Sequence, residues 1–554
     1  MFRKRTFNDR FWEILPGLQL WTVFFGAVIL SAFRPIWAAL FIVCFDFYWV
    51  LKAINTATHL ITAYRKFRVA VTIDWLDFNV QLANFNQFAE FLNLKSQKAK
   101  TNVARKLYKG ELIKIQAKIA EGLSRADYLN FYHLVLIPFS NENFEILDST
   151  FSALAKSVYP KDKMMLLLAS EEGAGLGAQE VSKQIKQKYE HHFLKFFTAI
   201  HPEGLAGEIK GKSANASYAM ETVLPQLLNL GIGVDQVLVS NFDSDTIVHP
   251  QYFARVMYEF LTVEKPYQTS YQPISVYNNN IWDTPAVVRV VSVSNSFWQF
   301  LESSRPDRLR TFSSHTMTLK ALLDVGFWKK DIINEDGYIY WQCYLHYKGN
   351  YWVAPLFIPI SLDTCLARSL WQTLINQYKQ KRRWAYNVEY YPHLLPALLK
   401  SSAPFWDKTR KLYQYVEGNF NWGTASILIS FLGWLPLFLG GDAFINSSVG
   451  YNLPLVTKSL MTIATFFLIF SVYINLILLP PRPKRYSVFR SVMMYLQWFL
   501  VPLASVVFGS LPAVEAQTRL MFGRYLEFWI TPKARKGENT GLMMKEMRVI
   551  NEQK

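Results

Sequence analysis

The strongest chemical signal in the sequence is a pair of aspartates that follows an apolar run. In Val237-Leu-Val-Ser-Asn-Phe-Asp-Ser-Asp245, a segment of strand type delivers Asp243 and Asp245, separated by one residue. Hard divalent cations prefer oxygen ligands, and Mg²⁺ in proteins is typically held by one or two carboxylates together with substrate phosphates. The pair therefore predicts a site for Mg²⁺ or Mn²⁺ that faces a diphosphate.

Two earlier segments also place acids directly after apolar runs. Glu142 follows Val135–Phe139, and the pair Glu171 and Glu172 follows Leu166–Ala169. Carboxylates in such places can accept hydrogen bonds from a nucleotide base or a ribose. The alternative for Glu142 is the start of a helix, and the alternative for Glu171 and Glu172 is an ordinary acidic loop.

A lysine opens the predicted helix of Gly211-Lys-Ser-Ala-Asn215. The start of a helix favours anions, so Lys212 is placed to contact a phosphate or a sugar. The alternative is a plain helix start that Ser213 caps.

A second acid pair, Glu335 and Asp336, precedes the aromatic segment Tyr338–Tyr344. Transfer of a group to a hydroxyl needs a base that takes the proton of the acceptor, and a positioned carboxylate can do this. We expect Asp336 to be that base and Glu335 to shape the site or to raise the pKa of its neighbour. Complementation of the helix dipole by two acids is the alternative.

The cluster Gln380-Lys-Arg-Arg-Trp384 ends a predicted amphipathic helix that has Leu366, Leu370 and Leu374 on one face. A basic helix at a membrane interface explains Lys379, Lys381 and Arg382. It does not explain why glutamine and tryptophan bracket the cluster. Arginine pairs with a diphosphate in bidentate fashion and tryptophan stacks on sugar rings, so Arg383 and Trp384 suit a sugar diphosphate.

These residues lie in a region where strand-like and helix-like segments alternate, between about Tyr132 and Ser240. Such alternation predicts a parallel sheet with helices on both faces, and such sheets bind ligands at the carboxyl ends of their strands. The predicted strands are His133–Phe139, Met164–Ala169, Phe193–Ile200 and Gln236–Ser240, and the predicted helices cover 143–157, 177–190 and 213–228.

The apolar residues collect at both ends of the chain. Ile14–Phe33 and Ile36–Leu51 are each long enough to cross a bilayer core of ~30 Å, and together they predict a hairpin with both ends in the cytoplasm. A cleavable signal peptide is the alternative for the first segment, but no small-residue cleavage site follows it. Near the other end, Trp422–Gly440 and Leu455–Leu479 predict two more spans.

A third carboxyl-terminal apolar stretch, Val492–Gly509, contains Pro502. A full crossing would put the basic residues between Arg519 and Lys536 outside the cell, against the positive-inside tendency. A re-entrant path that returns them to the cytoplasm is therefore favoured, since irregular backbone at membrane depth is tolerated where protein covers it.

Composition agrees with a membrane protein. Hydrophobic residues make up 51% of the 554 residues and charged residues only 18%, which is less charge than a soluble enzyme carries. The net charge of +17 is spread beside apolar spans and no nucleic-acid motif is present, so lipid headgroups rather than nucleic acid are the expected partners. The three cysteines have no metal-ligand spacing.

Taken in order, these segments resemble the family 2 glycosyltransferases with a GT-A fold. They are most similar to the membrane-integrated synthases of cellulose, chitin and hyaluronan, over residues 130–390 and the flanking membrane segments. The stretch Phe528-Trp-Ile-Thr-Pro-Lys533 is similar to the gating-loop motif of the cellulose synthases.

The resemblance implies roles for individual residues. Asp243 and Asp245 match the acids that bind metal and nucleotide, and Asp336 matches the general base. Gln380 and Arg383 match residues that hold the diphosphate, and Trp384 matches one at the acceptor end. The residues expected to bind the nucleotide-sugar are Glu142, Glu171, Glu172, Lys212, Asn215, Asp243, Gln380 and Arg383.

This sequence departs from the family pattern in two places. Ser170-Glu171-Glu172 stands where the family usually has an aspartate that contacts uracil. Phe312-Ser-Ser-His-Thr316 stands where cellulose synthases have Phe-Cys-Gly-Ser, which leaves the sugar and the acceptor open.

The resemblance implies a Rossmann-like α/β GT-A catalytic domain in the cytoplasm, between amino-terminal and carboxyl-terminal transmembrane helices, in an integral protein of a bacterial plasma membrane. The expected regions are a transmembrane hairpin (1–54), amphipathic linker helices (55–130), the catalytic domain (131–362), interface helices (363–420), a transmembrane region (421–512) and a cytoplasmic tail (513–554).

The implied activity is that of an inverting hexosyltransferase that uses a UDP-sugar. The leading interpretation is processive elongation of a polysaccharide, with synthesis and secretion coupled. The first alternative is single transfer to a lipid acceptor such as polyprenyl phosphate or diacylglycerol, and the second is a non-catalytic membrane scaffold. The sugar, the linkage, the oligomeric state and any accessory subunits stay open.

Overall fold

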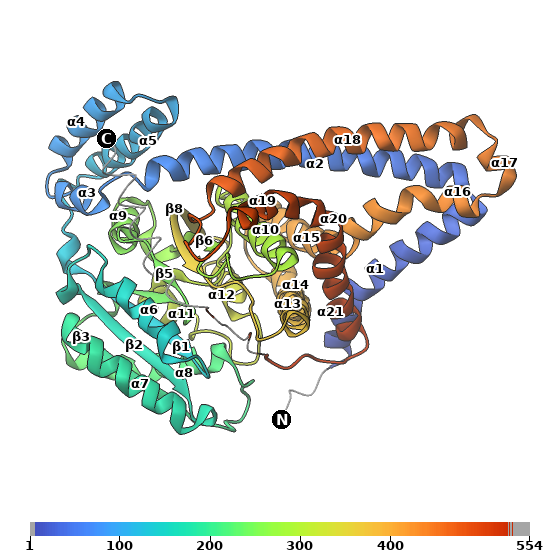
Figure 1. Cartoon of the computed structure of the whole chain (residues 1–554). Helices are drawn as coiled ribbons and strands as arrows, with labels where there is room; N and C mark the ends of the chain where they lie inside the picture. Colours follow the sequence, from blue (N-terminus) through green and yellow to red (C-terminus); the bar gives the residue numbers. More distant parts are fainter. Residues whose placement is uncertain (1–5, 530, 532–534, 536–554) are drawn as a thin grey trace.

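The protein is described by a computed structural model that covers residues 6–529, 531 and 535. Its centre is an α/β domain built on one mixed sheet of eight strands, in the order β3-β2-β1-β4-β7-β6-β8-β5. Figure 1 shows this domain on one side and long helices extending away from it on the other.

Four strands form the parallel part of the sheet, as the sequence predicted. Strand β1 pairs in parallel with β2 on one side and with β4 on the other, and β2 pairs in parallel with β3. Their carboxyl ends consequently lie at one edge of the sheet. The bounds are Tyr132–Phe139 for β1, Met164–Glu171 for β2, Lys195–His201 for β3 and Val237–Asn241 for β4.

The other half of the sheet contains antiparallel pairs that the sequence pattern did not predict. Strand β7 runs antiparallel to β4 and β6, and β5 runs antiparallel to β8, whereas β6 and β8 are parallel. The prediction of a parallel sheet therefore holds only for the first four strands. The bounds are Ile247–Val248 for β5, Thr269–Tyr277 for β6, His315–Thr318 for β7 and Trp352–Leu362 for β8.

Helices cover both faces of the sheet. Because side chains of a strand alternate between faces, Val135 and Ile137 of β1 enter one core, with α6, α7 and α9, while Leu134 and Leu136 enter a second core, with α8, α11 and α12. The bounds are α6 Phe144–Ala155, α7 Gly175–Tyr189, α8 Lys212–Asn229, α9 Tyr252–Thr262, α11 Leu319–Asp324 and α12 Glu335–His346.

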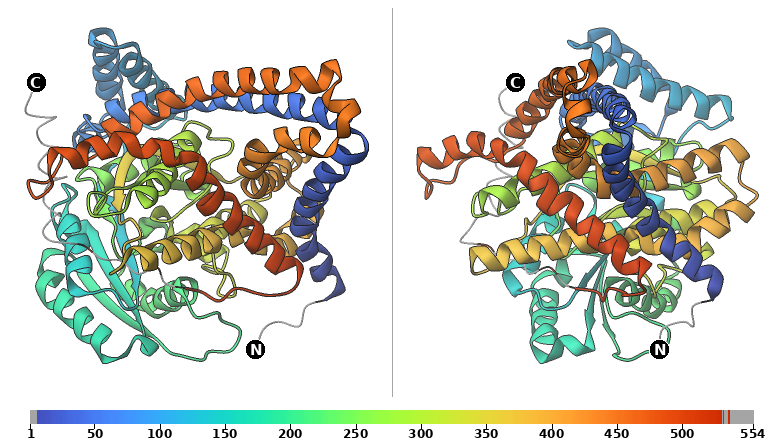
Figure 2. Two further views of the ribbon diagram at one scale, coloured as in Figure 1. Left: turned by 45° about the vertical axis from the view of Figure 1, so that its right-hand side comes forward. Right: turned by 90° about the vertical axis from the view of Figure 1, so that its right-hand side faces the viewer.

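Five helical stretches in the described part of the chain are long and apolar enough to cross a membrane. The helix α2 continues to Ala70, well past the predicted end of the second span near Leu51. Figures 1 and 2 show α2 and α18 side by side along much of their length. The five stretches are Phe7–Phe33 (α1), Pro35–Ala70 (α2), Phe405–Leu439 (α15 Phe405–Phe431 and α16 Leu435–Leu439), Ser448–Ile474 (within α18, Ser448–Ile477) and Val488–Met521 (α19 Val488–Leu496, α20 Val501–Ser505 and α21 Leu511–Met521).

The last of these stretches contacts the α/β domain or its interface helices at both ends. Near its beginning, the Arg490 guanidinium donates hydrogen bonds to the Trp282 and Thr284 carbonyls. At its end, α21 packs so closely on α1 that a Cβ at Gly17 would lie 2.7 Å from the Cβ of Met521. The re-entrant path of this stretch stays a prediction.

The remaining helices connect these parts. Three form a bundle beside the end of α2, corresponding to the predicted linker helices, and three more lie between the sheet domain and the apolar helices; α17 precedes α18. They are α3 Trp75–Gln81, α4 Phe85–Lys98, α5 Asn102–Ala120, α10 Ala286–Ser303, α13 Leu370–Ala385, α14 Tyr391–Lys400 and α17 Gly441–Ile445.

Candidate active site

A cavity of about 640 Å³ lies at the carboxyl ends of β1, β2 and β4. It is the place where an open α/β sheet binds ligands. The cavity brings together every predicted site residue except Glu172: Glu142, Glu171, Lys212, Asn215, Asp243, Asp245, Glu335, Asp336, Gln380, Arg383 and Trp384 line it.

Lys212, the first residue of α8, lies between two acids of this cavity. Its Nζ donates a hydrogen bond to Asp243 Oδ1 at 2.7 Å and lies 3.7 Å from Glu335 Oε1. Burial lowers the pKa of Lys212, but the charges of Asp243, Glu335 and Asp336 outweigh it and hold that pKa above its usual value. Lys212 is therefore charged at neutral pH and balances part of the negative charge around it.

The two acids that open α12 differ in burial. Glu335 is 3% exposed, and burial together with the charge of Asp336 raises the pKa of Glu335 to about 7. Asp336 is half-buried, and one of its carboxylate oxygens accepts a hydrogen bond from the Gly337 N–H at 3.1 Å. Of the two, Asp336 is thus the more open to a ligand. The sequence analysis expected Glu335 to raise the pKa of its neighbour, but the raised pKa is that of Glu335 itself.

Asp245 is held by the end of β8. The Asp363 N–H donates to Asp245 Oδ2 at 2.7 Å, and Asn279 Nδ2 donates both to the Asp245 carbonyl at 3.0 Å and to Asp363 Oδ1 at 2.8 Å. The antiparallel pairing of β5 with β8 brings these residues together. Sequence reasoning missed Asp363, although it follows an apolar strand just as Asp243 does.

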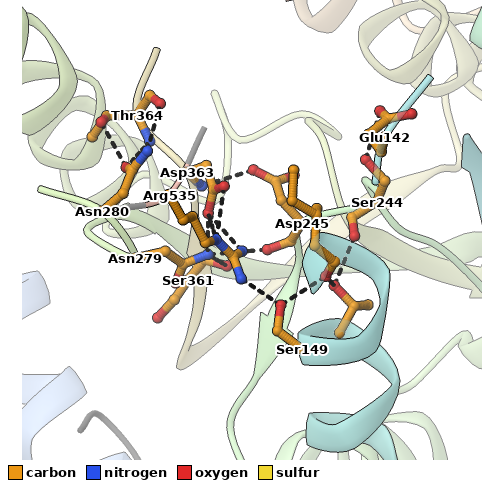
Figure 3. A network of polar contacts seen from close by, with 12 residues as sticks. Glu142, Ser149, Ser244, Asp245, Asn279, Asn280, Ser361, Asp363, Thr364 and Arg535 are labelled. Atoms are coloured by element: carbon orange, nitrogen blue, oxygen red, sulfur yellow. Dashed lines mark hydrogen bonds and ion pairs between the residues drawn. The ribbon is translucent and has the colours of Figure 1, made fainter. Parts of the chain in front are cut away.

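The carboxyl-terminal segment reaches this network. The Arg535 guanidinium donates to both carboxylate oxygens of Asp363, at 2.7–3.1 Å, and to Ser149 Oγ (Figure 3). Earlier in the same segment Phe528, Trp529 and Thr531 of the Phe528–Lys533 motif line the cavity. Ile530, Pro532 and Lys533 of this motif lie outside the described residues.

The loop before β7 completes the surroundings of Asp243. Ser313 Oγ donates to Asp243 Oδ2, and Ser314 Oγ accepts from the Asp243 N–H at 3.3 Å. The register places His315 opposite Asn241, so the start of β7 lies beside the end of β4. The departure from the family pattern at 312–316 therefore falls directly on the predicted metal site.

The two other acid segments behave differently from each other. Glu142 accepts hydrogen bonds from Ser140 N–H and from Ser244 Oγ, both at 2.8 Å, and so joins the end of β1 to the end of β4. Glu171 is buried at the end of β2, and burial raises its pKa. Glu172 does not line the cavity: it turns to the Glu203 N–H at 3.1 Å, because the helical turn after β2 directs it outward.

The start of α8 differs from the capping alternative. Gly211 occupies the cap position, no side chain caps the helix, and Ser213 Oγ donates instead to the Lys329 carbonyl. Asn215 Nδ2 donates to the Ala169 carbonyl at 3.1 Å. A Cβ at Gly211 would lie 2.7 Å from the Phe528 ring, so the glycine allows the carboxyl-terminal segment to lie against this helix.

Helix α13 carries the basic cluster into the cavity. It begins at Leu370, so Leu366 precedes the helix rather than continuing its apolar face, as the sequence had suggested. Gln380 Nε2 donates to Thr531 Oγ1 at 3.3 Å, and the Arg383 guanidinium lies 5.2 Å from the centre of the Phe528 ring. The Trp384 ring lies 6.0 Å from the Tyr277 ring. A role as a basic helix at the membrane interface does not alone account for this inward placement.

The donor groups of the cavity fit a metal held jointly with a ligand. Asp243 and Asp245 both supply hard carboxylate oxygens to the cavity. Among the described residues no group of three or more His, Cys, Asp or Glu side chains forms a complete metal site. The residues present suit a Mg²⁺ or Mn²⁺ ion whose coordination is completed by phosphate oxygens.

No protein-family model and no curated protein matches the sequence. Solved structures that align with the chain include a mannosyltransferase from Pyrobaculum calidifontis in complex with GDP-Man and Mn²⁺ (13% identity, TM-score 0.37, 76% of this chain and 98% of that one). They also include residues 1–349 of S. aureus TarS in complex with UDP-GlcNAc (11% identity, TM-score 0.35, 72% and 94%). Values this low carry no argument about function, so the activity is inferred from the cavity itself.

Proposed function

We propose that the protein is a membrane-integrated, metal-dependent, inverting glycosyltransferase of the family 2 GT-A type that transfers a hexose from a UDP-sugar. The observation that carries this proposal is the convergence of two acid pairs, Asp243 with Asp245 and Glu335 with Asp336, on one cavity that also holds Lys212 and Arg383. One acid pair suits a metal and a diphosphate, and the other supplies a base.

The chain's own residues account for donor binding and for charge. Lys212 and Arg383 bind the diphosphate, and their charges stabilise it as it leaves. Glu142 and Glu171, at the ends of the first two strands, offer carboxylate oxygens to the nucleoside. A divalent ion held by Asp243 and Asp245 would supply further neutralisation of the leaving diphosphate.

Asp336 acts as general base on the acceptor. It accepts the proton of an acceptor hydroxyl while that oxygen forms a bond to the anomeric carbon of the sugar. The bond between this carbon and the UDP oxygen breaks in the same step, and UDP leaves with the electron pair. A single displacement of this kind inverts the anomeric configuration.

The acceptor end of the cavity leads to the membrane. Trp384 and the α15 residues Tyr415 and Trp422 line the cavity, and α15 belongs to a stretch long and apolar enough to span a bilayer. Aromatic rings along such a path suit successive sugars. These features favour a growing polysaccharide as the acceptor. In this proposal the catalytic domain lies in the cytoplasm, and the polysaccharide passes through the membrane to the external side.

The test is a screen of UDP-sugars with the purified full-length protein in lipid nanodiscs and Mg²⁺. We expect at least one UDP-sugar to release UDP, and the products to form a ladder of increasing length. Products with one added sugar on a lipid would favour the non-processive alternative. No release of UDP from any UDP-sugar, by a protein shown to be folded, would overturn the proposal and favour the scaffold interpretation.

A further inference from the structure

The cavity contains a cation that the proposed chemistry does not use. Arg310 lines it together with Trp341 of α12 and Tyr415 of α15. The guanidinium carbon lies 4.4 Å from the centre of the Trp341 ring and 5.4 Å from that of Tyr415. Both rings are almost fully buried. The flat faces of the guanidinium are thus packed against rings, an arrangement that does not occupy its N–H donors.

Arg310 also differs from its neighbours in having no polar partner. Among residues 6–529, 531 and 535, no side chain or carbonyl lies within hydrogen-bonding or ion-pairing distance of its guanidinium. Neighbouring cations are paired: Arg308 lies 3.6 Å from Glu417, Lys411 Nζ donates to the Asp307 carbonyl at 3.3 Å, and Lys381 donates to Asn295 at 2.8 Å.

The nearby acids are engaged elsewhere. Glu302 lies 3.5 Å from Arg305, and Asp307 lies 3.4 Å from Arg410. Glu417 is held by Lys52 of α2 in addition to Arg308. No carboxylate in the described part of the chain therefore forms an ion pair with Arg310. Only the more distant charge of Glu302 acts on it, although burial of an unpaired guanidinium is unfavourable. Burial accordingly lowers the pKa of Arg310 from its usual value.

Arg310 lies close to the donor site but contacts the helix at the acceptor end. Ser313, three residues later, reaches Asp243, so the backbone between the two positions spans at most about 10 Å. The donor diphosphate already has Lys212 and Arg383 in its surroundings. Arg310 instead packs on α15, the candidate membrane span that lines the acceptor end.

We propose that the acceptor carries an oxyanion, a carboxylate or a phosphate, that binds to Arg310 between Trp341 and Tyr415. The inference rests on the proposed function and specifies its acceptor. The planar guanidinium matches either oxyanion with two parallel hydrogen bonds, and the two rings hold it in that orientation. Two sources share this chemistry: an acidic sugar of a polysaccharide and the phosphate of a lipid headgroup.

The experiment measures binding of matched acceptor probes to the full-length protein in nanodiscs. One pair is a tetrasaccharide that contains glucuronate and its carboxyl-reduced form, and the other is dodecyl phosphate and dodecanol. We expect one acidic probe to bind at least about 10-fold more tightly than its neutral form. The pair that shows the difference identifies the source of the oxyanion.

The variants Arg310→Gln and Arg310→Lys test the residue. Arg310→Gln should remove the preference for the acidic probe, with an about 10- to 100-fold loss of its affinity, and Arg310→Lys should retain part of it. UDP-sugar affinity and binding of the neutral probe should stay at the parent values in both variants, which shows that the cavity is intact.

Three results would overturn the inference. The first is that neither acidic probe binds more tightly than its neutral form. The second is that the preference survives in Arg310→Gln with UDP-sugar binding unchanged. Weaker UDP-sugar binding in Arg310→Gln would assign Arg310 to the donor and equally overturn it. Because binding does not require turnover, these outcomes are distinct from failure of the proposed activity, which would show as absence of UDP release in the donor screen.

Discussion

The Nζ of Lys212 lies 2.7 Å from Oδ1 of Asp243, so the first residue of α8 places a cation beside the predicted metal and diphosphate site. The side chain is positioned by the helix start, where Gly211 leaves room for Phe528 of the carboxyl-terminal segment. Lys212 also lies near Glu335, so one cation links the two acid pairs on which the proposed chemistry depends.

Lys212→Met should therefore weaken UDP binding about 10- to 100-fold, the usual effect of losing one hydrogen bond to a charged group. Isothermal titration of UDP into the purified protein with Mg²⁺ measures it. Lys212→Arg is the control, because it keeps the charge and should retain most of the affinity. Equal affinity in the parent and in Lys212→Met would show that this cation does not contact the diphosphate.

Removal of the metal should stop turnover. Excess chelator should abolish UDP release, and added Mg²⁺ or Mn²⁺ should restore it, because Asp243 and Asp245 provide only part of a coordination shell. Asp245→Asn should keep the melting temperature of the parent within a few degrees but lose activity at any Mg²⁺ concentration. Full turnover in excess chelator contradicts this expectation.

Glu335 should make stability depend on pH. Its pKa is about 7 in the fold and 4.5 ordinarily, so the folded state binds the proton more tightly than the unfolded state. The protonated form of Glu335 thus stabilises the fold. This stability is lost as the pH rises from the ordinary pKa of 4.5 through the folded-state pKa of about 7. Between about pH 5.5 and about pH 8.5 the parent should lose about 2 kcal/mol from this group.

Glu335→Gln cannot ionise and should not show this loss. Thermal unfolding of parent and variant across that pH range compares them directly. We expect the variant to gain stability relative to the parent as the pH rises. A stability difference that is the same at both ends of the range would show that Glu335 does not titrate in this interval.

The orientation in the membrane has a direct test. Asn446, between α17 and α18, and Lys183, on α7, are both exposed. The native cysteines Cys343 and Cys365 are buried, and Cys44 lies within α2. In intact cells, a membrane-impermeant maleimide should label Asn446→Cys and should reach Lys183→Cys only after lysis. Labelling of Lys183→Cys before lysis would reverse the proposed topology.

The residues that were predictable from sequence depend on short-range patterns. Asp243 and Asp245 follow a buried strand, and the alternation of strand and helix around them is a local pattern. The two acids and the alternating elements could therefore be predicted, and with them the edge of the sheet at which the acids meet. Asp363 also follows a strand, β8. This strand contains Pro355 and Pro359, and prolines make a strand hard to recognise from sequence.

The other features depend on pairing between distant segments. The antiparallel entry of β7 beside β4 brings Ser313 and Ser314 to Asp243, and no local pattern specifies that register. The sequence pattern also does not show that Glu172 lies outside the cavity, where a helical turn directly after β2 directs it. The significance of Arg310 lies in the absence of a partner in the described chain, which only three-dimensional contacts reveal.

The rate of sugar transfer by Asp336→Asn tests the central claim most directly. A general base contributes typically ~10²–10⁴-fold to a rate, so the variant should transfer sugar slower by a factor in that range. Its affinity for UDP, measured by titration, should stay near that of the parent, because Asp336 faces the acceptor in this account. Transfer by Asp336→Asn at the parental rate would contradict the account.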